Sequence, residues 1–342
     1  MAIKIYPNRI EFERYSLIIG CNGLFVSSNA DLSNTSAYAC LTFPDRTFGS
    51  IFQGTVAGYT TGGYSVPYSN VIDKFPFAVN SSATSVGNLT ISRGDLSGQS
   101  SSIFGYSSGG FASDYCNQID KFSFASNGNA TSVGVLTQSR RVQTGQSSAV
   151  SGYASGGGNP AGVTTIDKFP FATDTNAVSV ANLSEGRRGS TGQSSSLSGY
   201  TSGGNPVSVP DTTRIDKFPF ATDTNAVCVG SLSQSRWVTA GQSSVSHGYT
   251  TGGYSGPSKV NTIDKFPFTS EGTASSVGTL SQQRGYMAGQ SSSVAGYTSG
   301  GGEGVPVGNV NKIDKHPFSI DSSATCIGAL TQARRISAGQ QV

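Results

Sequence analysis

Short runs of alternating apolar and polar residues fill the chain, and no stretch shows the 3.6-residue period of an amphipathic helix. These runs repeat along the sequence. The string Ile-Asp-Lys-Phe, or a close variant, recurs at intervals of 47, 47, 49, 48 and 50 residues, beginning at Ile72, Ile119, Ile166, Ile215, Ile263 and Ile313. The pattern indicates six repeats of about 48 residues between residues 47 and 335.

Two glycine landmarks keep the same spacing. Gly-Tyr, followed shortly by Gly-Gly, begins at Gly58, Gly105, Gly152, Gly199, Gly248 and Gly296. Gly-Gln begins at Gly98, Gly145, Gly192, Gly241, Gly289 and Gly339. An arginine precedes each Gly-Gln pair: Arg93, Arg140, Arg187, Arg236, Arg284 and Arg334. The landmarks therefore divide every repeat in the same way.

Each repeat has the residues of four short strands. The first strand is the Ser-rich run after Gly-Gln, the second is the Gly-Tyr segment, and the third is the Ile-Asp-Lys-Phe run. The fourth holds a Val-and-Leu pair such as Val86 and Leu89. Proline follows Phe75, Phe169, Phe218 and Phe266, and we expect it to end the third strand because it cannot donate to a ladder. Four strands per repeat predict an all-β fold in which each repeat is one propeller blade.

The repeat resembles that of the kelch family of β-propellers. The resemblance lies in Tyr-x-x-Gly-Gly (Tyr59 to Gly63 in the first repeat), the aromatic residue ending the third strand, and the connection from leucine to arginine. It covers residues 36 to 342, although valine or isoleucine replaces the tryptophan usual in the fourth strand. The chain also looks similar to Gly/Ser-rich repeat propellers in virion structural proteins of tailed bacteriophages. The resemblance implies a kelch-like β-propeller in a virion protein.

Counting strands predicts seven blades. A first-type strand occurs near Ile51 to Ala57 and again at the end, where residues 336–342 would form a closing strand. Residues 16–46 would supply a partial blade of three strands. Two of them are LIIG and LFVSS, which a Cys-Asn-Gly turn joins, and the third lies in Ala37 to Arg46. Residues 1–15 would be an N-terminal arm or docking strand, and residues 16–342 the propeller. The alternative is six blades with a separate N-terminal β segment.

Composition narrows the class of protein. Only 12% of the 342 residues are charged, the net charge is +3, and 45 residues are glycine. These values exclude a coiled coil and disfavour disorder, and they give no strong field for nucleic acid or anionic lipid. No apolar stretch is long enough to span a bilayer, and the first residues lack the apolar core of a signal peptide. We therefore expect that the protein does not insert into a membrane and that it is made in a host cytoplasm.

Repeated polar residues indicate structure rather than chemistry. Six glutamines lie in the first strands, which line the central channel of a propeller: Gln99, Gln146, Gln193, Gln242, Gln290 and Gln340. Neutral amides provide no general base, so we expect a structural polar ring, and a small neutral ligand in the channel is the alternative. The aspartates of Ile-Asp-Lys and the six arginines recur in every repeat, so we expect ion pairs and hydrogen bonds within or between blades.

Rare residues offer no chemistry either. His247 and His316 occupy different strand positions, and we expect the five cysteines to be reduced, with Cys228 and Cys326 as small buried side chains. The sequence thus predicts no catalytic residue, no cofactor, no metal and no enzyme.

Variation is concentrated between Gly-Gly and Ile-Asp, where 8 to 11 residues differ from repeat to repeat. These loops and the connections between blades leave the same face of an up-and-down propeller, so that face is the candidate binding surface. Its aromatic residues are suited to stacking on sugar rings or anchoring a protein, although tolerated loop drift is the alternative. The candidate residues are Tyr64, Tyr68, Phe111, Tyr115, Asn159, Asn205, Asp211, Tyr254, Lys259 and Glu303.

Three hypotheses for function follow. The first is a non-enzymatic phage virion protein (fibre, tail or capsid accessory) that presents the propeller for recognition. Its partners would be other virion proteins and a host-surface glycan or protein, its location the virion, and its state an oligomer within an assembly. The second is a cellular kelch-like interaction module. The third is a carbohydrate-active enzyme such as a sugar mutarotase or oxidase, which would need unique acids clustered at one mouth of the channel.

Overall fold

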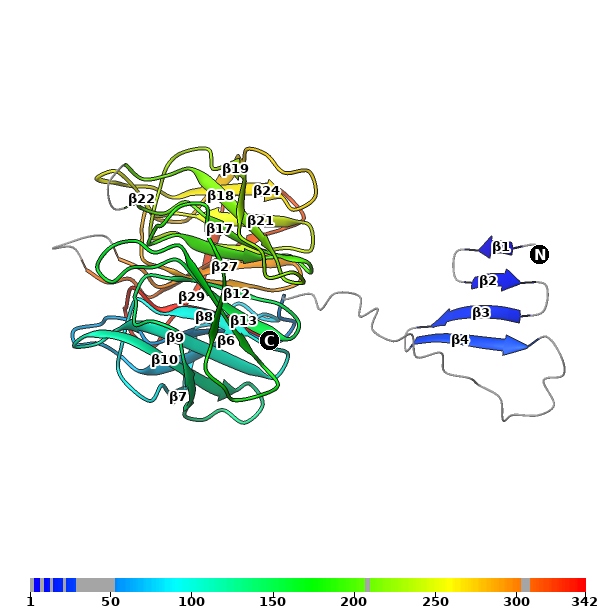
Figure 1. Cartoon of the computed structure of the whole chain (residues 1–342), viewed down its shortest axis with the longest axis horizontal. Helices are drawn as coiled ribbons and strands as arrows, with labels where there is room; N and C mark the ends of the chain where they lie inside the picture. The colour runs from blue at the N-terminus through cyan, green and yellow to red at the C-terminus, as the bar shows by residue number, and fades with distance from the viewer. Residues whose placement is uncertain are drawn as a thin grey trace. The chain divides into compact units, whose positions relative to one another are not determined.

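Six four-stranded antiparallel sheets, each one blade, make up most of the molecule (Figure 1). The computed structural model describes residues 53–206, 210–302 and 308–342, together with the backbone of four strands near the N-terminus. The chain divides into two units, Met1–Phe48 and Gly49–Val342. No helix of the described residues is long and apolar enough to cross a membrane.

The blades follow one another along the chain. The first contains β5 (Ala57–Thr61), β6 (Val71–Pro76) and β7 (Thr84–Asn88). The second contains β8 (Ser97–Ser100), β9 (Phe104–Phe111), β10 (Tyr115–Ser123) and β11 (Thr131–Val135). The third contains β12 (Thr144–Ser147), β13 (Ser151–Ser155), β14 (Thr165–Pro170) and β15 (Val178–Asn182). As expected, prolines end the third strands β6 and β14.

The remaining blades have the same order. The fourth contains β16 (Thr191–Ser194), β17 (Ser198–Ser202), β18 (Arg214–Pro219) and β19 (Val227–Ser231). The fifth contains β20 (Ala240–Ser243), β21 (His247–Thr251), β24 (Thr262–Pro267) and β25 (Ser275–Thr279), with the short hairpin β22 (Tyr254–Ser255) and β23 (Ser258–Lys259) in its loop. The sixth contains β26 (Ala288–Ser291), β27 (Ala295–Ser299), β28 (Lys312–Pro317) and β29 (Thr325–Ala329).

The last strand, β30 (Ala338–Gln341), closes the ring by pairing with β5. It is the innermost strand of the first blade, in the order β30-β5-β6-β7. The prediction of seven blades is therefore wrong, and the six-bladed alternative is confirmed. The segment before Ala57, which was expected to be a first-type strand, is not the innermost strand of the first blade because β30 occupies that place. Gly54, in this segment, forms an isolated bridge with Ser292.

The N-terminal strands form a separate sheet and no blade. LIIG lies in β3 (Tyr15–Gly20) and LFVSS in β4 (Gly23–Ser28), and the two pair as the expected hairpin. Their other partners are β2 (Arg9–Phe12) and, through it, β1 (Ile3–Tyr6), in the order β1-β2-β3-β4. The expected strand in residues 37–46 lies outside the described residues.

A ring of glycines explains how six inner strands meet around the axis. A Cβ atom on any Gly-Gln glycine would collide with the carbonyl oxygen of the corresponding glycine in the neighbouring blade. The contacts run through Gly98, Gly145, Gly192, Gly241, Gly289 and Gly339 and return to Gly98. Only glycine permits this close approach of backbones.

Aromatic rings fill the space between blades. The tyrosine of each second strand packs against the phenylalanine that lies two residues after the aromatic residue of the third strand in the next blade, with ring centroids 4.6 to 4.9 Å apart. Tyr106 stacks on Phe171 in this way. The ring of the third-strand aromatic residue covers the glycine of Gly-Tyr, where a Cβ would collide with it. The glutamines also join blades, since each Nε2 donates to the carbonyl oxygen of that tyrosine in the next blade at 2.9 to 3.0 Å.

Six fully buried ion pairs join blades in the same way. Each repeat arginine contacts the aspartate of the third strand at 2.8 to 3.2 Å, and both side chains are 0% exposed. A Ser or Thr hydroxyl from the end of the preceding blade donates to the same carboxylate at 2.7 Å. The expectation of ion pairs and hydrogen bonds within or between blades is confirmed.

Cys228 and Cys326 are exposed, so the prediction that they are small buried side chains is wrong. Each lies in the outermost strand of its blade, at a position that faces solvent.

His316 replaces the third-strand phenylalanine in the sixth blade. It is buried, and its ring nitrogens have no hydrogen-bond partner among the described residues.

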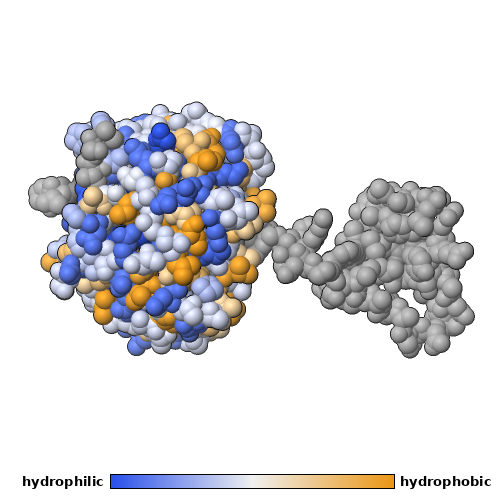
Figure 2. Space-filling view, viewed as in Figure 1, coloured by the Kyte–Doolittle hydropathy of each residue, from blue (hydrophilic) through white to orange (hydrophobic). Residues whose placement is uncertain are grey.

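Apolar side chains also reach the surface at the opposite ends of the blades from the variable loops. The turn before each second strand exposes one aliphatic residue: Val56, Ile103, Val150, Leu197, Val245 and Val294. On the face in view in Figure 2, apolar residues form small groups among polar ones.

Candidate functional site

The connections between blades meet at the axis in a second ring. Two residues after each repeat arginine, the backbone takes a left-handed conformation, with φ between +48° and +66°. The N–H group of each such residue donates to the carbonyl oxygen of the equivalent residue in the preceding connection at 2.5 to 3.0 Å, and the bond from Asp95 to Ile336 closes the circle of six. Its members are Asp95, Val142, Gly189, Val238, Tyr286 and Ile336. The ring fixes unique side chains around the mouth of the propeller.

The variable loops are attached to these connections by backbone pairing. Tyr64, the first residue after Gly-Gly in the first blade, exchanges hydrogen bonds with Arg335 at 2.8 and 3.2 Å. The equivalent pairs are Phe111 with Gly94, Gly158 with Arg141, Asn205 with Arg188, Tyr254 with Trp237, and Gly302 with Gly285. Positive φ at the two preceding glycines, +60° and +110° at Gly62 and Gly63, turns each loop toward its connection.

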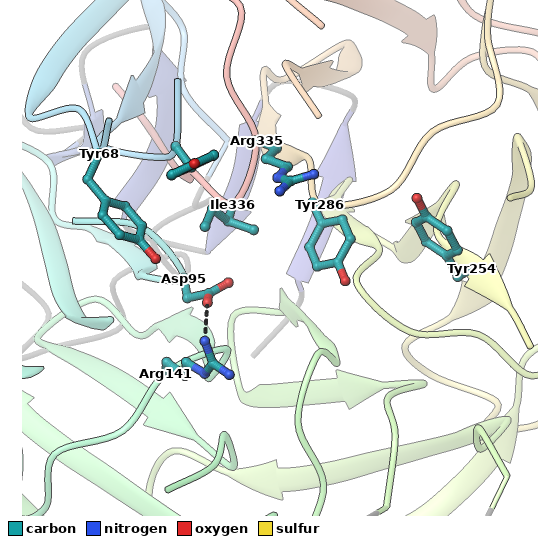
Figure 3. A pocket seen from close by; sticks show the side chains of 8 residues that line it. Tyr68, Asp95, Arg141, Tyr254, Tyr286, Arg335 and Ile336 are labelled. Carbon is teal, nitrogen blue, oxygen red and sulfur yellow. Dashed lines mark ion pairs between the residues drawn. The ribbon is translucent and has the colours of Figure 1, made fainter. Parts of the chain in front are cut away.

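A pocket of about 500 Å³ lies where these loops and connections converge (Figure 3). The residues that line it are Tyr64, Tyr68, Asp95, Arg141, Tyr254, Tyr286, Arg335 and Ile336. Four of the eight are tyrosines, two are arginines and one is an aspartate. In Figure 3, Asp95 lies between Tyr68 and Tyr286, and a dashed line joins it to Arg141.

Both pocket arginines are held against aromatic rings. The guanidinium of Arg141 lies 5.0 Å from the ring centre of Phe111 and 5.6 Å from that of Tyr115. The guanidinium of Arg335 lies 5.4 Å from Tyr64 and 6.0 Å from Tyr286. Such cation–π contacts orient a planar guanidinium while leaving its N–H groups available.

Asp95 is the acid of the pocket. Its side chain is 9% exposed, and one carboxylate oxygen lies 3.6 Å from Arg141, too far for a hydrogen bond. Burial raises the pKa of Asp95 to about 6, although Arg141, Arg335 and Arg188 oppose the rise. Burial and the charge of Asp95 also raise the pKa of Tyr68 and of Tyr286, so both phenols remain protonated donors at neutral pH.

The structure brings together part of the expected surface. Tyr64, Tyr68 and Tyr254 line the pocket. Phe111 and Tyr115 contact the guanidinium of the lining residue Arg141. The others do not line it: Asn159, Asn205, Asp211 and Lys259. Asp211 accepts hydrogen bonds from the Asn205 side chain and from the Gly256 backbone, so it links neighbouring loops. Glu303 lies outside the described residues.

Sequence reasoning missed the residues contributed by the connections: Asp95, Arg141, Tyr286, Arg335 and Ile336. A signal for them was present. The two positions after the repeat arginine read Gly-Asp, Arg-Val, Arg-Gly, Trp-Val, Gly-Tyr and Arg-Ile, which is as variable as the loops. Such variation beside an invariant arginine marks a position that the blade itself does not constrain.

The central channel is narrow and lined by repeated groups. Cavities of about 60 and 110 Å³ both border the glycine ring, and residues around the Gly-Gln pairs line them. The glutamine amides bond to neighbouring blades. Gln53 reaches the carbonyl oxygen of Ser243. The side chains that differ from repeat to repeat line the axial pocket of about 500 Å³ instead.

Comparison with known proteins supports the fold. No family model matches the chain, and no curated protein matches it. Among solved structures, one described as "Structure of YjhT" superposes with a TM-score of 0.61 and 13% sequence identity, covering 73% of this chain and 88% of that chain. At this identity the likeness shows the fold alone. Together with the six sheets described above, it establishes that the chain forms a six-bladed β-propeller.

Proposed function

We propose that the propeller is a non-enzymatic recognition module that binds a saccharide in the axial pocket. The observation that carries the proposal is the gathering of residues that break the repeat at one concave place. The volume of the pocket, about 500 Å³, falls in the range of small-molecule sites.

The chemistry of the lining fits a sugar. Tyrosine rings offer apolar faces for stacking against the C–H face of a pyranose, and their hydroxyls offer hydrogen bonds at the edge. The Tyr254 hydroxyl has no hydrogen-bond partner among the described residues. Arginine and aspartate supply the few oriented polar groups that select one ligand over another.

We further propose that the protein belongs to a tailed-phage particle, where the pocket would recognise a host-surface glycan and other surfaces would contact virion proteins. This placement rests on the resemblance of the Gly/Ser-rich repeats to phage propellers. Mass spectrometry of purified particles tests it. Consistent recovery of the chain with known virion proteins supports the placement, and its absence from pure particles refutes it.

A glycan array with purified protein tests recognition itself. We expect binding to a small set of glycans and its loss in the variants Tyr68→Ala and Tyr254→Ala. Leu197→Ala is the matched control, because that side chain is 76% exposed in the turn before β17, at the opposite end of this strand from the variable loop. Binding that survives both tyrosine variants would refute the pocket as the site.

One observation favours a second candidate, an enzyme acting on a sugar. A carboxyl group with a pKa raised to about 6 is suited to general acid or base catalysis near neutral pH, and Asp95 has tyrosine hydroxyls nearby. A turnover screen with candidate sugars, repeated with Asp95→Asn, tests this. Turnover that Asp95→Asn abolishes would replace recognition by catalysis as the function.

A further inference from the structure

The charges around the pocket are unbalanced. Three guanidinium groups, those of Arg141, Arg188 and Arg335, act on a single carboxyl group, that of Asp95. Counted over these four described side chains, the charge is +2 when Asp95 is ionised and +3 when it is protonated. A positive balance in a partly buried pocket is unfavourable unless an anion joins it, because burial weakens the screening of charge by water.

The two arginines that line the pocket differ in what they already bind. Arg141 has Asp95 at 3.6 Å, which partly balances its charge. Arg335 donates no side-chain hydrogen bond and forms no ion pair within the described parts of the chain; its guanidinium only stacks on Tyr64 and Tyr286. Its N–H groups are therefore available to donate hydrogen bonds to a ligand. Stacking on two rings also reduces the conformational freedom that a ligand would otherwise have to restrict.

We propose that the ligand of the pocket is anionic, with a carboxylate or sulfate group bound by Arg335 and with Arg141 as the secondary contact. This inference rests on the proposed function for the location of the ligand, and it adds the class of ligand. A planar guanidinium can bind either group through two parallel N–H···O bonds. The anion would supply the acceptors that Arg335 lacks in the described structure.

Asp95 would make this binding depend on pH. The charged and titratable groups that interact electrostatically with its carboxyl group are Arg141, Arg188, Arg335, Tyr68 and Tyr286, and these tyrosines remain neutral below pH 8. Ionised Asp95 repels an incoming anion and competes for Arg141. We therefore expect anion affinity to rise severalfold as pH falls through about 6, and to lose this dependence in Asp95→Asn.

The first experiment compares matched pairs of glycans that differ only in charge, such as uronic acids with their neutral hexoses and sulfated with unsulfated sugars. We expect the acidic member of a pair to bind at least tenfold more tightly, since a charge-assisted hydrogen bond is among the stronger polar contacts. Equal binding of the neutral member would overturn the anionic ligand while leaving saccharide recognition intact.

A second experiment does not depend on finding the right sugar. Inorganic sulfate is titrated against the full chain, with tyrosine fluorescence and melting temperature as readouts. We expect saturable changes in the wild-type protein that Arg335→Gln removes. Sulfate binding without any glycan binding would support the anion site and refute the saccharide. No response to sulfate and no acidic glycan bound would overturn this inference.

Variants then separate the anchor from general charge. Arg335→Gln should lower the affinity for the acidic ligand by tenfold or more, Arg141→Gln by less, and Arg335→Lys should restore only part of the loss because the planar fork is missing. Arg214→Gln is the matched control, since Arg214 pairs with Glu185 and does not line the pocket. An equal loss in Arg214→Gln would show a general effect of net charge and would overturn the assignment of Arg335.

Discussion

Neighbouring arginines in the chain belong to two contrasting regions. Arg140 and Arg334 lie between blades, fully buried against Asp167 and Asp73. The next residues, Arg141 and Arg335, border the axial pocket. The blade interface pairs every such arginine with an aspartate in six equivalent copies, whereas the pocket holds single copies, of which Arg141 faces Asp95 at 3.6 Å and Arg335 has no ion-pair partner among the described residues. The comparison teaches that repetition in this chain marks the blade interfaces, and under the proposed function its interruption marks the binding site.

The largest effect should come from opening the ring. Deletion of residues 337–342 removes β30 and with it the inner strand of the first blade, the Gln340 bond to Tyr106 and one member of the glycine ring. We expect the loss of most of the cooperative melting transition. Differential scanning calorimetry measures it. Gln341→Ser, which restores the residue of the other blades, should melt like the wild type; an unchanged transition in the deletion would contradict closure by β30.

Removing one partner of a buried ion pair should cost somewhat less. Arg187→Met leaves the Asp216 carboxylate without its guanidinium in a fully buried place, so we expect a loss of about 3 to 5 kcal/mol in unfolding free energy. Urea denaturation measures this loss. The surface variant Arg214→Met should change stability little, because exposed ion pairs contribute about 0 to 1 kcal/mol. Similar losses in the two variants would erase the distinction between interface and surface.

His316 should make the interface sensitive to acid. Burial lowers the pKa of His316 to about 4 from the ordinary 6.5, so the unfolded chain takes up a proton before the folded protein does. The unfolding free energy therefore has its full value above pH 6.5. It falls by about 3 kcal/mol as the pH decreases from about 6.5 to 4, because the unfolded chain is then stabilised by protonation of His316. Thermal melts across this range should show a shallower decline for His316→Phe, which has the residue of the other blades. Parallel pH profiles would contradict the prediction.

A ring glycine should tolerate no side chain. Gly192→Ala places a Cβ against the carbonyl oxygen of Gly145, and we expect a cost of about 1 to 3 kcal/mol as the inner strands move apart. Gly128→Ala is the control, because no atom lies within 4 Å of its added Cβ. Equal melting temperatures for the two variants would mean that the inner strands are not in close contact.

The smallest effect on stability should come from the pocket. Tyr68→Ala removes a half-buried loop side chain, and we expect unfolding free energy to change by about 1 kcal/mol or less while ligand binding is lost. Urea denaturation and the glycan array measure the two properties on the same preparation. A large loss of stability with binding retained would reverse the roles assigned to the two regions.

The blades could be predicted because each repeat carries its own local instructions. The Gly-Tyr, Ile-Asp-Lys-Phe and Gly-Gln strings place strands, turns and prolines within about 48 residues, and the strand boundaries follow them. The number of blades could not be predicted in the same way. The sequence offered the segment before Ala57 as the innermost strand of the first blade, but β30 takes that place because it completes the ring, and local pattern does not encode that choice.

The sequence by itself determined the all-β architecture, the repeat and the face on which variable loops gather, because strand patterning and turn residues act over short distances. Only the tertiary structure decided that six inner strands close through a glycine ring and that Asp95, Arg141 and Arg335 meet the tyrosines of other blades in one pocket. These residues lie up to about 270 positions apart in the chain. Their meeting depends on the closed ring, whose backbone hydrogen bonds bring every connection to the same axis.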